Sequence, residues 1–314
     1  MSSLRCPSFT SGDKLPAHYP KAQMSTGTHL ESLMQGYHWG SNYLFVDPPV
    51  SPAGTVGNSL ARATGSSLEF MEHREYMAGD DLRRIDWNAY ARNDRLALKL
   101  YRDEVNPHVD LLLDVSKSMA LPDTRKSEAA CALAGFFASA AAAAHFTFNL
   151  WVTDNGCRKL GRSTGIPTAW DPFEFTGMQT PADAMQQQPP NWRPRGIRIF
   201  VSDLLFLADP EQVVAAVAAH AAVTIVIQLL AQSDANPPGE GNLRLIDSET
   251  SQRFELFLDS LARKRYLANL GRHQENYNAA CRRHGATMTT LIDEQFLEHR
   301  AVDDLLAAEM IRVK

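Results

Sequence analysis

One acid and two hydroxyls recur at every second position just after an apolar segment. Asp114, Ser116 and Ser118 follow residues 109–113, an apolar run of strand length, and a helical pattern begins soon after them. In an open α/β sheet, ligands bind where the carboxyl end of a strand enters a helix. A carboxylate and two hydroxyls are hard oxygen donors, a set that suits Mg²⁺. The alternative is that these side chains only cap the following helix.

Two later segments strengthen the metal interpretation. Residues 197–202 form a second apolar run of strand length, and Asp203 directly follows it. Between the two runs lies a loop at 176–184, which gives way to a short predicted helix with Thr180 at its start. The sequence therefore places a second acid at a strand end, and between the two runs a threonine at the start of a helix.

These segments resemble the metal-ion-dependent adhesion site of von Willebrand factor A domains. In that site an Asp-x-Ser-x-Ser loop, a threonine from a second loop and an aspartate from a third loop converge on one divalent cation. The second loop could also be aligned on Thr176. The resemblance implies Mg²⁺, with Mn²⁺ or Ca²⁺ as alternatives, and Asp203 acting directly or in the second shell. The implied metal-site residues are Asp114, Ser116, Ser118, Thr180 and Asp203.

Composition places the chain among ordinary globular proteins. Apolar residues make up 44% of its 314 residues and charged residues 21%. A net charge of −5 gives no electrostatic case for binding nucleic acid, which normally needs a basic face. Its 4 cysteines include no Cys-x-x-Cys pair, which argues against a zinc site and fits free thiols in a reducing compartment. Because the N-terminus has no apolar core typical of a signal peptide, we expect a cytoplasmic protein.

An alanine-rich stretch at 129–148 approaches the roughly 20 residues that a membrane-spanning helix needs. It contains His145 and sits between two segments that read as strands of one sheet. We therefore expect a helix packed tightly against that sheet and no insertion into a membrane.

The alternation of strand and helix patterns predicts an α/β fold with a doubly wound, mostly parallel sheet of the von Willebrand A or Rossmann-like type. A β-hairpin predicted over 242–258 departs from a plain nucleotide-binding sheet. The predicted organisation is a disordered tail at 1–28, an N-terminal extension at 29–105 and the α/β domain at 106–314.

The extension carries a second unusual stretch, residues 65–87, in which acids, arginines and aromatics alternate too densely for a simple core strand. A local explanation is that Asp80 or Asp81 caps a short helix and that the arginines pair with neighbouring acids. The other is that the segment forms a rigid polar surface used in partner recognition. The candidate partner-binding residues are Glu69, Arg74, Tyr76, Asp80, Asp81, Arg83, Asp86 and Trp87.

This stretch resembles the hallmark of domain-of-unknown-function family 58. Members of that family look like von Willebrand A proteins encoded beside MoxR-type AAA+ ATPases. The resemblance continues through Lys99 and Glu104 into Asp-x-Ser-x-Ser, and it covers roughly residues 60–290. Many relatives carry N-terminal membrane helices, and their lack here suggests the soluble subgroup. The resemblance implies a MoxR-type ATPase, a client protein, or both, as partners.

The sequence favours a binding protein over an enzyme. A cation with an open coordination position can take a partner's Glu or Asp carboxylate. The chain lacks a Gly-x-x-x-x-Gly-Lys-Ser/Thr loop, so we expect no ATP hydrolysis by the chain alone.

The alternative function is a Mg²⁺-dependent phosphate-ester hydrolase with Asp114 as nucleophile. Against it, Ser116 stands where haloacid-dehalogenase-like phosphatases place a catalytic Asp. No lysine has a clear charge-balancing role in the sequence, and no Gly-x-Ser-x-Gly elbow surrounds either serine.

Overall fold

The computed structural model divides into two compact units, Met1–Val50 with Pro107–Lys314, and Ser51–Asn106. Each unit is described below by itself. The residues that the structure describes are 7–8, 26–46, 68–77, 80, 85–103, 107–161, 165–237, 239, 241–247, 253–307 and 310–314.

The larger unit is built on a six-stranded sheet of order β12-β9-β8-β5-β6-β7. Every neighbouring pair is parallel except β6 with β7, which is antiparallel. This confirms the expected α/β fold with a mostly parallel sheet. The strands are β5 (His108–Asp114), β6 (Thr147–Thr153), β7 (Cys157–Leu160), β8 (Ile197–Ser202), β9 (Val223–Leu230) and β12 (Ala286–Ile292).

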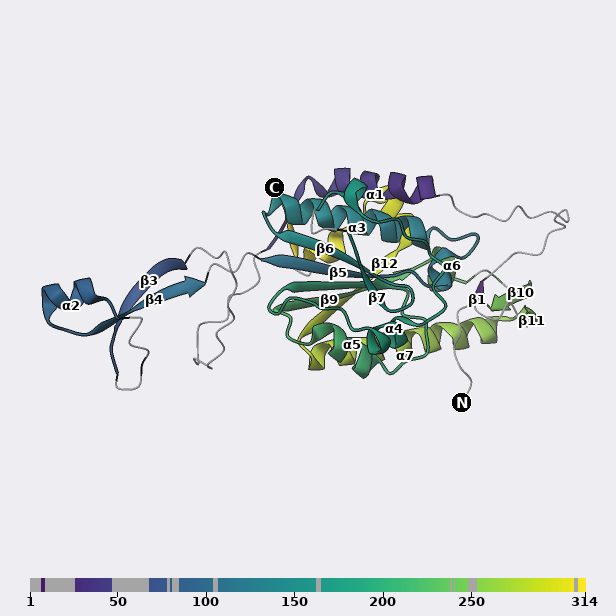
Figure 1. The fold of residues 1–314 in the computed structure, drawn as a ribbon. Helices are drawn as coiled ribbons and strands as arrows, with labels where there is room; N and C mark the ends of the chain where they lie inside the picture. The colour runs from purple at the N-terminus through teal and green to yellow at the C-terminus, as the bar shows by residue number, and fades with distance from the viewer. Residues whose placement is uncertain are drawn as a thin grey trace. The chain divides into compact units, whose positions relative to one another are not determined.

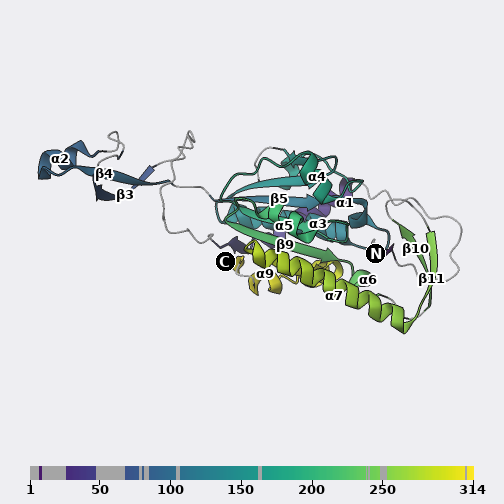
Figure 2. The same cartoon turned by 90° about the horizontal axis from the view of Figure 1, so that it is seen from below.

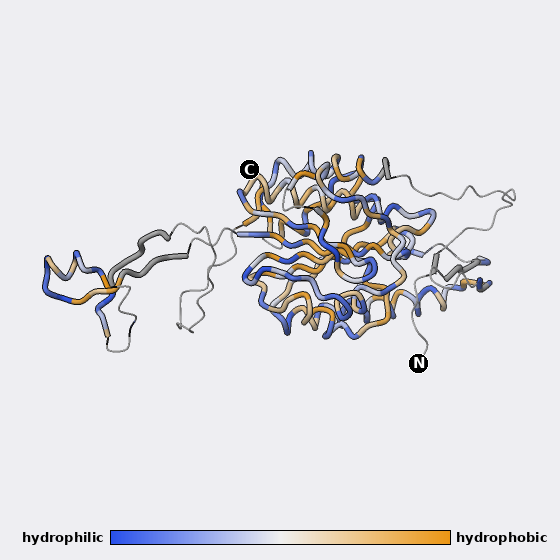
Figure 3. Tube along the Cα trace, in the orientation of Figure 1, coloured by the Kyte–Doolittle hydropathy of each residue, from blue (hydrophilic) through white to orange (hydrophobic). Residues whose placement is uncertain are grey.

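Helices cover both faces of this sheet, with α1 and α3 on one face and α4, α5 and α7 on the other (Figures 1 and 2). A strand covered on both faces needs apolar side chains at nearly every position, which explains why β5 is buried along its whole length. The central strands are accordingly among the most hydrophobic parts of the chain (Figure 3). The helices are α1 (Thr26–Gly40), α3 (Lys126–Ala143), α4 (Pro181–Gln187), α5 (Pro210–Ala218), α6 (Gln232–Ala235), α7 (Ser260–Arg283), α8 (Asp293–His299) and α9 (Asp303–Ala307).

The strand order reverses between β5 and β8. From β5 the chain continues to β6 on one side, and it later returns to β8 on the other. In doubly wound folds the crevice at such a reversal, outside the carboxyl ends of the strands, is the usual ligand site. Asp114 ends β5 and Asp203 directly follows β8, so both lie at this position.

Helix α1 belongs to the larger unit, because it packs on α3 with very close backbone contact. A Cβ added to Gly36 would lie 1.8 Å from the Ala132 carbonyl oxygen, and one added to Gly135 would lie 2.0 Å from that of Leu33. The predicted extension at 29–105 therefore divides. Its first part belongs to the larger unit, where α1 packs on α3, and Ser51–Asn106 forms the separate unit.

A small three-stranded sheet contains the predicted hairpin, with β10 (Gly241–Asp247) antiparallel to β11 (Arg253–Leu258). Two residues of the predicted N-terminal tail, Pro7–Ser8, form β1 against β10. Helix α1 already begins at Thr26, and the remainder of the predicted tail lies outside the described residues. A further antiparallel pair joins β2 (Tyr43–Phe45) to β13 (Ile311–Val313).

The smaller unit pairs β3 (Leu68–Glu75) with β4 (Ala97–Asp103) in an antiparallel ribbon, with an irregularity between Phe70 and Glu72. A short helix, α2 (Trp87–Asn93), lies between the two strands in sequence. Across the described parts of both units, no helix combines the length and apolar character needed to cross a membrane.

Candidate functional site

The Asp114 carboxylate is completely buried and both of its oxygens are held. Oδ1 accepts a hydrogen bond from the Ser116 backbone N–H at 2.9 Å, and Oδ2 accepts one from the Ser202 hydroxyl at 2.6 Å. Ser202 is the last residue of β8, so this second bond ties the ends of two neighbouring strands together. The turn after β5 therefore holds its acid in one orientation.

The two serine hydroxyls predicted as ligands lie next to each other. Ser116 Oγ and Ser118 Oγ are 3.0 Å apart, and both residues are half-buried. Residues Lys117–Ala120 form a short 3₁₀ turn, which brings the alternate side chains together. The first three predicted ligands thus form one compact set of oxygens at the carboxyl end of β5.

The loop that carries Thr180 runs beside the Asp114 turn. Gly177 forms an isolated parallel bridge with Ser116. The Gly177 N–H donates to the Val115 carbonyl at 3.0 Å, and the Gly177 carbonyl accepts from the Lys117 N–H at 3.1 Å. The Thr180 hydroxyl itself caps α4: it accepts from Asp183 N at 3.1 Å and donates to Asp183 Oδ2 at 2.8 Å. The structure therefore brings the loop to the site but uses the threonine hydroxyl within its own helix.

Asp203 is also completely buried, in a strained turn. The next residue, Leu204, has φ of 58° although it is a buried leucine, a conformation that persists only when neighbours enforce it. Its N–H donates to Ser202 Oγ at 3.0 Å, and its carbonyl lies 2.7 Å from His273 Nε2 on α7. Strain held in this way is characteristic of a functional turn.

Two residues of this edge were missed in the sequence. Lys126, the first residue of α3, places Nζ 2.9 Å from Asp203 Oδ2 and 3.4 Å from Asp234 Oδ2. Asp234 lies in α6, just after β9, which is the next strand beyond β8. An acid close behind a predicted parallel strand was the available signal for Asp234. Nothing in the sequence pairs Lys126 with an acid 77 positions away.

Burial makes the electrostatics of this edge unfavourable for its acids. Desolvation, followed by the neighbouring charge of Asp203, raises the pKa of Asp114 to about 6. One ammonium, that of Lys126, lies among the buried carboxylates of Asp203 and Asp234 close by. A divalent cation beside Asp114 would offset this excess of negative charge.

The donor chemistry fits Mg²⁺ at this position. In the described part of the chain, no group of three or more His, Cys, Asp or Glu side chains forms a metal cluster. A cation here would consequently depend on the Asp114 carboxylate, the serine hydroxyls and water. Mg²⁺ accepts such a set, since it commonly keeps several waters and takes few protein carboxylates.

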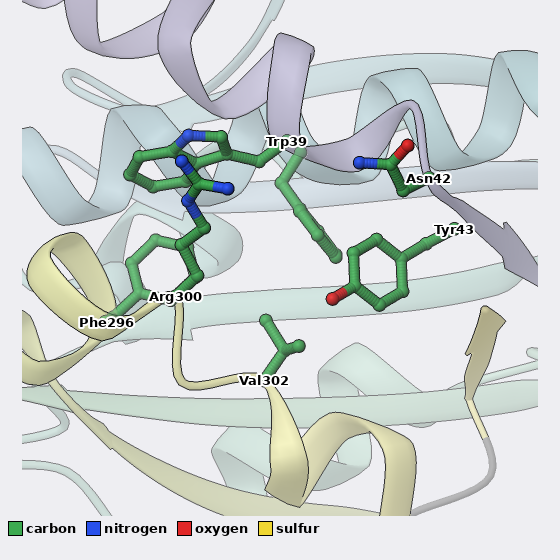
Figure 4. A pocket seen from close by; sticks show the side chains of 7 residues that line it. Trp39, Asn42, Tyr43, Phe296, Arg300 and Val302 are labelled. Carbon is green, nitrogen blue, oxygen red and sulfur yellow. The ribbon is translucent and has the colours of Figure 1, made fainter.

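A cavity elsewhere in the larger unit is too small for a substrate. It measures about 50 Å³, whereas small-molecule sites usually span roughly 300–1,000 Å³. The Arg300 guanidinium lies 5.4 Å from the Trp39 ring centroid, so the charge stacks on the indole at the cavity wall (Figure 4). The lining residues are Trp39, Asn42, Tyr43, Phe136, Phe296, Arg300 and Val302.

In the smaller unit, part of the predicted partner-binding segment makes internal contacts. Arg74 Nη2 lies 2.7 Å from Asp80 Oδ1, and Asp80 Oδ2 accepts from Met77 N at 2.9 Å. Asp86 is buried and caps α2 by accepting from the N–H groups of Asn88 and Ala89 at 2.9 and 3.2 Å. The Arg74–Asp80 pair agrees with the local explanation, whereas the cap of α2 is Asp86 and not Asp80.

Other residues of the segment remain free for recognition. Trp87 is 61% exposed and meets Tyr90 edge to face at 6.2 Å, while Tyr76 is half-buried. The Glu69 side chain, Asp81 and Arg83 lie outside what the structure describes. An exposed tryptophan beside a tyrosine is a common composition at protein interfaces.

The raised pKa of Asp114 predicts a specific pH dependence of stability. Because its folded value lies above its unfolded value, the carboxyl favours the fold most below about pH 4 and loses this contribution as the pH rises to about 6. An asparagine at position 114 does not titrate, so Asp114→Asn does not lose stability in this way. With a chelator present to remove metal ions, the difference in free energy of unfolding, Asp114→Asn minus wild type, should increase from pH 4 to pH 7 by on the order of 1–3 kcal/mol. Urea unfolding at both pH values measures this, and a pH-independent difference would show that Asp114 titrates normally.

Comparisons with known proteins agree with the resemblance seen in the sequence. The family model described as "Protein of unknown function DUF58" matches residues 72–276. Among solved structures, the crystal structure of the conserved hypothetical protein BatB from Bacteroides thetaiotaomicron is similar, with 10% sequence identity, a TM-score of 0.34, and 65% of this chain and 98% of that chain covered. The curated proteins include no match. Since the matched residues span more than half of the chain and include Arg74, Trp87, Asp114 and Asp203, the protein belongs to the DUF58 family.

Proposed function

We propose that this protein is a cation-dependent protein-binding adaptor, in which Mg²⁺ at the Asp114 edge captures a partner's carboxylate. The observation that carries the proposal is the burial of Asp114 and Asp203 together at the strand-order reversal, beside two adjacent hydroxyls. Buried carboxylates in excess of their counter-charges call for a cation, and the oxygens present suit a hard one.

The contacts suggest how the ligands divide. Asp114, Ser116 and Ser118 would hold the ion directly or through water. Asp203 differs from Asp114 in that its Oδ2 is already paired with a buried charge, the Lys126 ammonium at 2.9 Å, and this ion pair favours an indirect role for Asp203. Thr180 would have to exchange its bond to Asp183 for the ion.

A Mg²⁺ ion held by a single protein carboxylate keeps most of its positive charge. A partner's Glu or Asp can then complete its coordination, which makes the contact strong and selective for acidic groups. The family resemblance suggests a MoxR-type AAA+ ATPase, a client protein, or both, as partners. We infer a role in complex assembly or maturation, with Trp87 and Tyr76 of the smaller unit adding apolar contact.

Phosphate-ester hydrolysis is the second candidate. The position of Lys126 beside two buried acids supplies a lysine that could not be assigned from the sequence. A lysine close to a strand-end acid can stabilise the charge of a transferring phosphoryl group. Here, however, the Lys126 ammonium is paired with Asp203 and Asp234. In addition, Ser116 stands where haloacid-dehalogenase-like phosphatases place a catalytic Asp. Binding accounts better for this arrangement.

Removing the Asp114 carboxylate should abolish cation-dependent capture. Immobilised wild type is expected to retain a purified MoxR-type ATPase in Mg²⁺ and release it in chelator, whereas Asp114→Ala retains none in either buffer. Asp203→Ala should weaken capture less, because Asp203 acts indirectly. Glu275→Ala removes an exposed acid on α7 and should behave as wild type. Metal-dependent turnover of a phosphate ester that is lost with Asp114→Ala would replace the adaptor with the hydrolase.

In the smaller unit, a role in partner binding can be distinguished from a role in stabilising the fold, because Trp87 is exposed and Asp86 is buried. Trp87→Ala should reduce capture of the same ATPase at least fivefold and leave unfolding unchanged, because the side chain is 61% exposed. Asp86→Ala should instead lower the stability of α2 by about 1 kcal/mol through loss of its cap. Binding assays and thermal unfolding of both variants check this. Unaltered capture by Trp87→Ala would remove this residue from the interface.

A further inference from the structure

The Lys126 side chain is completely buried, which is rare for a lysine. It lies between Asp203 and Asp234, whose side chains are 1% and 3% exposed. Its ammonium therefore joins the start of α3 to the turns after β8 and β9. A lysine is buried in this way only when its charge is closely balanced by acids.

The same contact fixes the orientation of Asp203. Lys126 Nζ donates to Asp203 Oδ2 at 2.9 Å, and the Leu205 N–H donates to Asp203 Oδ1 at 3.0 Å. The Asp203 backbone carbonyl accepts from the Gln228 side-chain amide at 3.2 Å. Asp203 would have to break a buried ion pair in order to turn toward an ion held by Asp114. Breaking such a pair is unfavourable, since it removes the closest counter-charge from a carboxylate that stays buried.

Lys126 also enters the charge balance that a cation experiences. Its positive charge acts on Asp293 as well as on the two acids it contacts. A divalent ion at Asp114 would therefore meet one carboxylate outside the Lys126 ion pairs, neutral hydroxyls, and the ammonium that lies beside Asp203. Coulomb repulsion and the loss of Asp203 as a ligand both reduce the affinity for the ion.

We propose that Lys126 is a positioning residue that keeps the affinity of this site for free Mg²⁺ low by holding Asp203 away from the ion. The inference rests on the proposed function, and it specifies how the site is regulated. A weakly held ion retains the charge that attracts a partner's carboxylate. That carboxylate in turn tightens the ion, because the coupling between two ligands is reciprocal. Cation and partner would then bind the adaptor together.

Calorimetric titration of the full chain with Mg²⁺ alone, and with Mn²⁺ alone, tests this inference. Lys126→Gln removes the ammonium and frees Asp203, so the dissociation constant should fall at least tenfold. Asp234→Asn removes the carboxylate that competes with Asp203 for the Lys126 ammonium, and it removes one negative charge from this edge. The dissociation constant for the ion should therefore rise about threefold or more. Lys264→Gln, the same substitution at an exposed site on α7, is the matched control and should leave it unchanged. Circular dichroism and thermal unfolding verify that each variant is folded.

Opposite shifts in the two variants support the inference, since a merely structural role would change stability without moving ion affinity in opposite directions. If Lys126→Gln does not fold, the shift in Asp234→Asn decides. Wild-type binding that is lost with Asp114→Ala but equal or weaker in folded Lys126→Gln overturns the role of Lys126 and leaves the proposed function standing. Absence of binding in wild type and in folded Lys126→Gln overturns both.

Discussion

The carboxyl edge of the sheet is governed by buried negative charge. Asp114, Asp203 and Asp234 are withdrawn from water, and the ammonium of Lys126 lies among them. Burial of an ionised group is unfavourable unless its charge is balanced and its hydrogen bonds are made. The hydrogen bonds to Asp114 are made, but desolvation by burial, followed by the neighbouring charge of Asp203, raises its pKa to about 6. The strained turn at Leu204 contacts Ser202, which donates to Asp114, and the loop at Gly177 is hydrogen-bonded to the residues that follow Asp114.

The fold creates this edge through ordinary rules of α/β topology. The continuous apolar character of β5 requires helices on both faces, so polar groups can collect only at the strand ends. Strand order reverses between β5 and β8, and Lys126, the first residue of α3, contacts Asp203 and Asp234 behind the ends of β8 and β9. The scaffold is thus hydrophobic and rigid, while the chemistry lies in the turns.

Much of this arrangement could be predicted from the sequence, because it depends on local patterns. An apolar run that stops at an acid identified both β5 with Asp114 and β8 with Asp203. The alternating spacing of Ser116 and Ser118 predicted that their hydroxyls lie together, and they are 3.0 Å apart. The hairpin formed by β10 and β11 was likewise visible from its alternation.

Features that depend on long-range packing could not be predicted in this way. The pairing of Lys126 with Asp203 joins residues 77 positions apart, and no periodicity encodes it. The place of α1 beside α3 depends on the close fit of Gly36 and Gly135, which the alanine-rich pattern of α3 did not reveal. The hydroxyl of Thr180 could equally serve a cap or a cation in the sequence, and in the structure it caps α4.

The family has no function attached to it, so the chemistry of this edge carries the functional conclusion. The proposed cation beside Asp114 and the two serine hydroxyls would offset the negative charge of the carboxylates buried at this edge.

Anomalous diffraction from crystals soaked in Mn²⁺ tests this central claim most directly. A cation adaptor predicts an anomalous peak at about 2.0–2.2 Å from an oxygen of Asp114, with the hydroxyls of Ser116 and Ser118 in its first shell or one water away. Full soaking with no peak at this edge, or with a peak only at other surface acids, would contradict it.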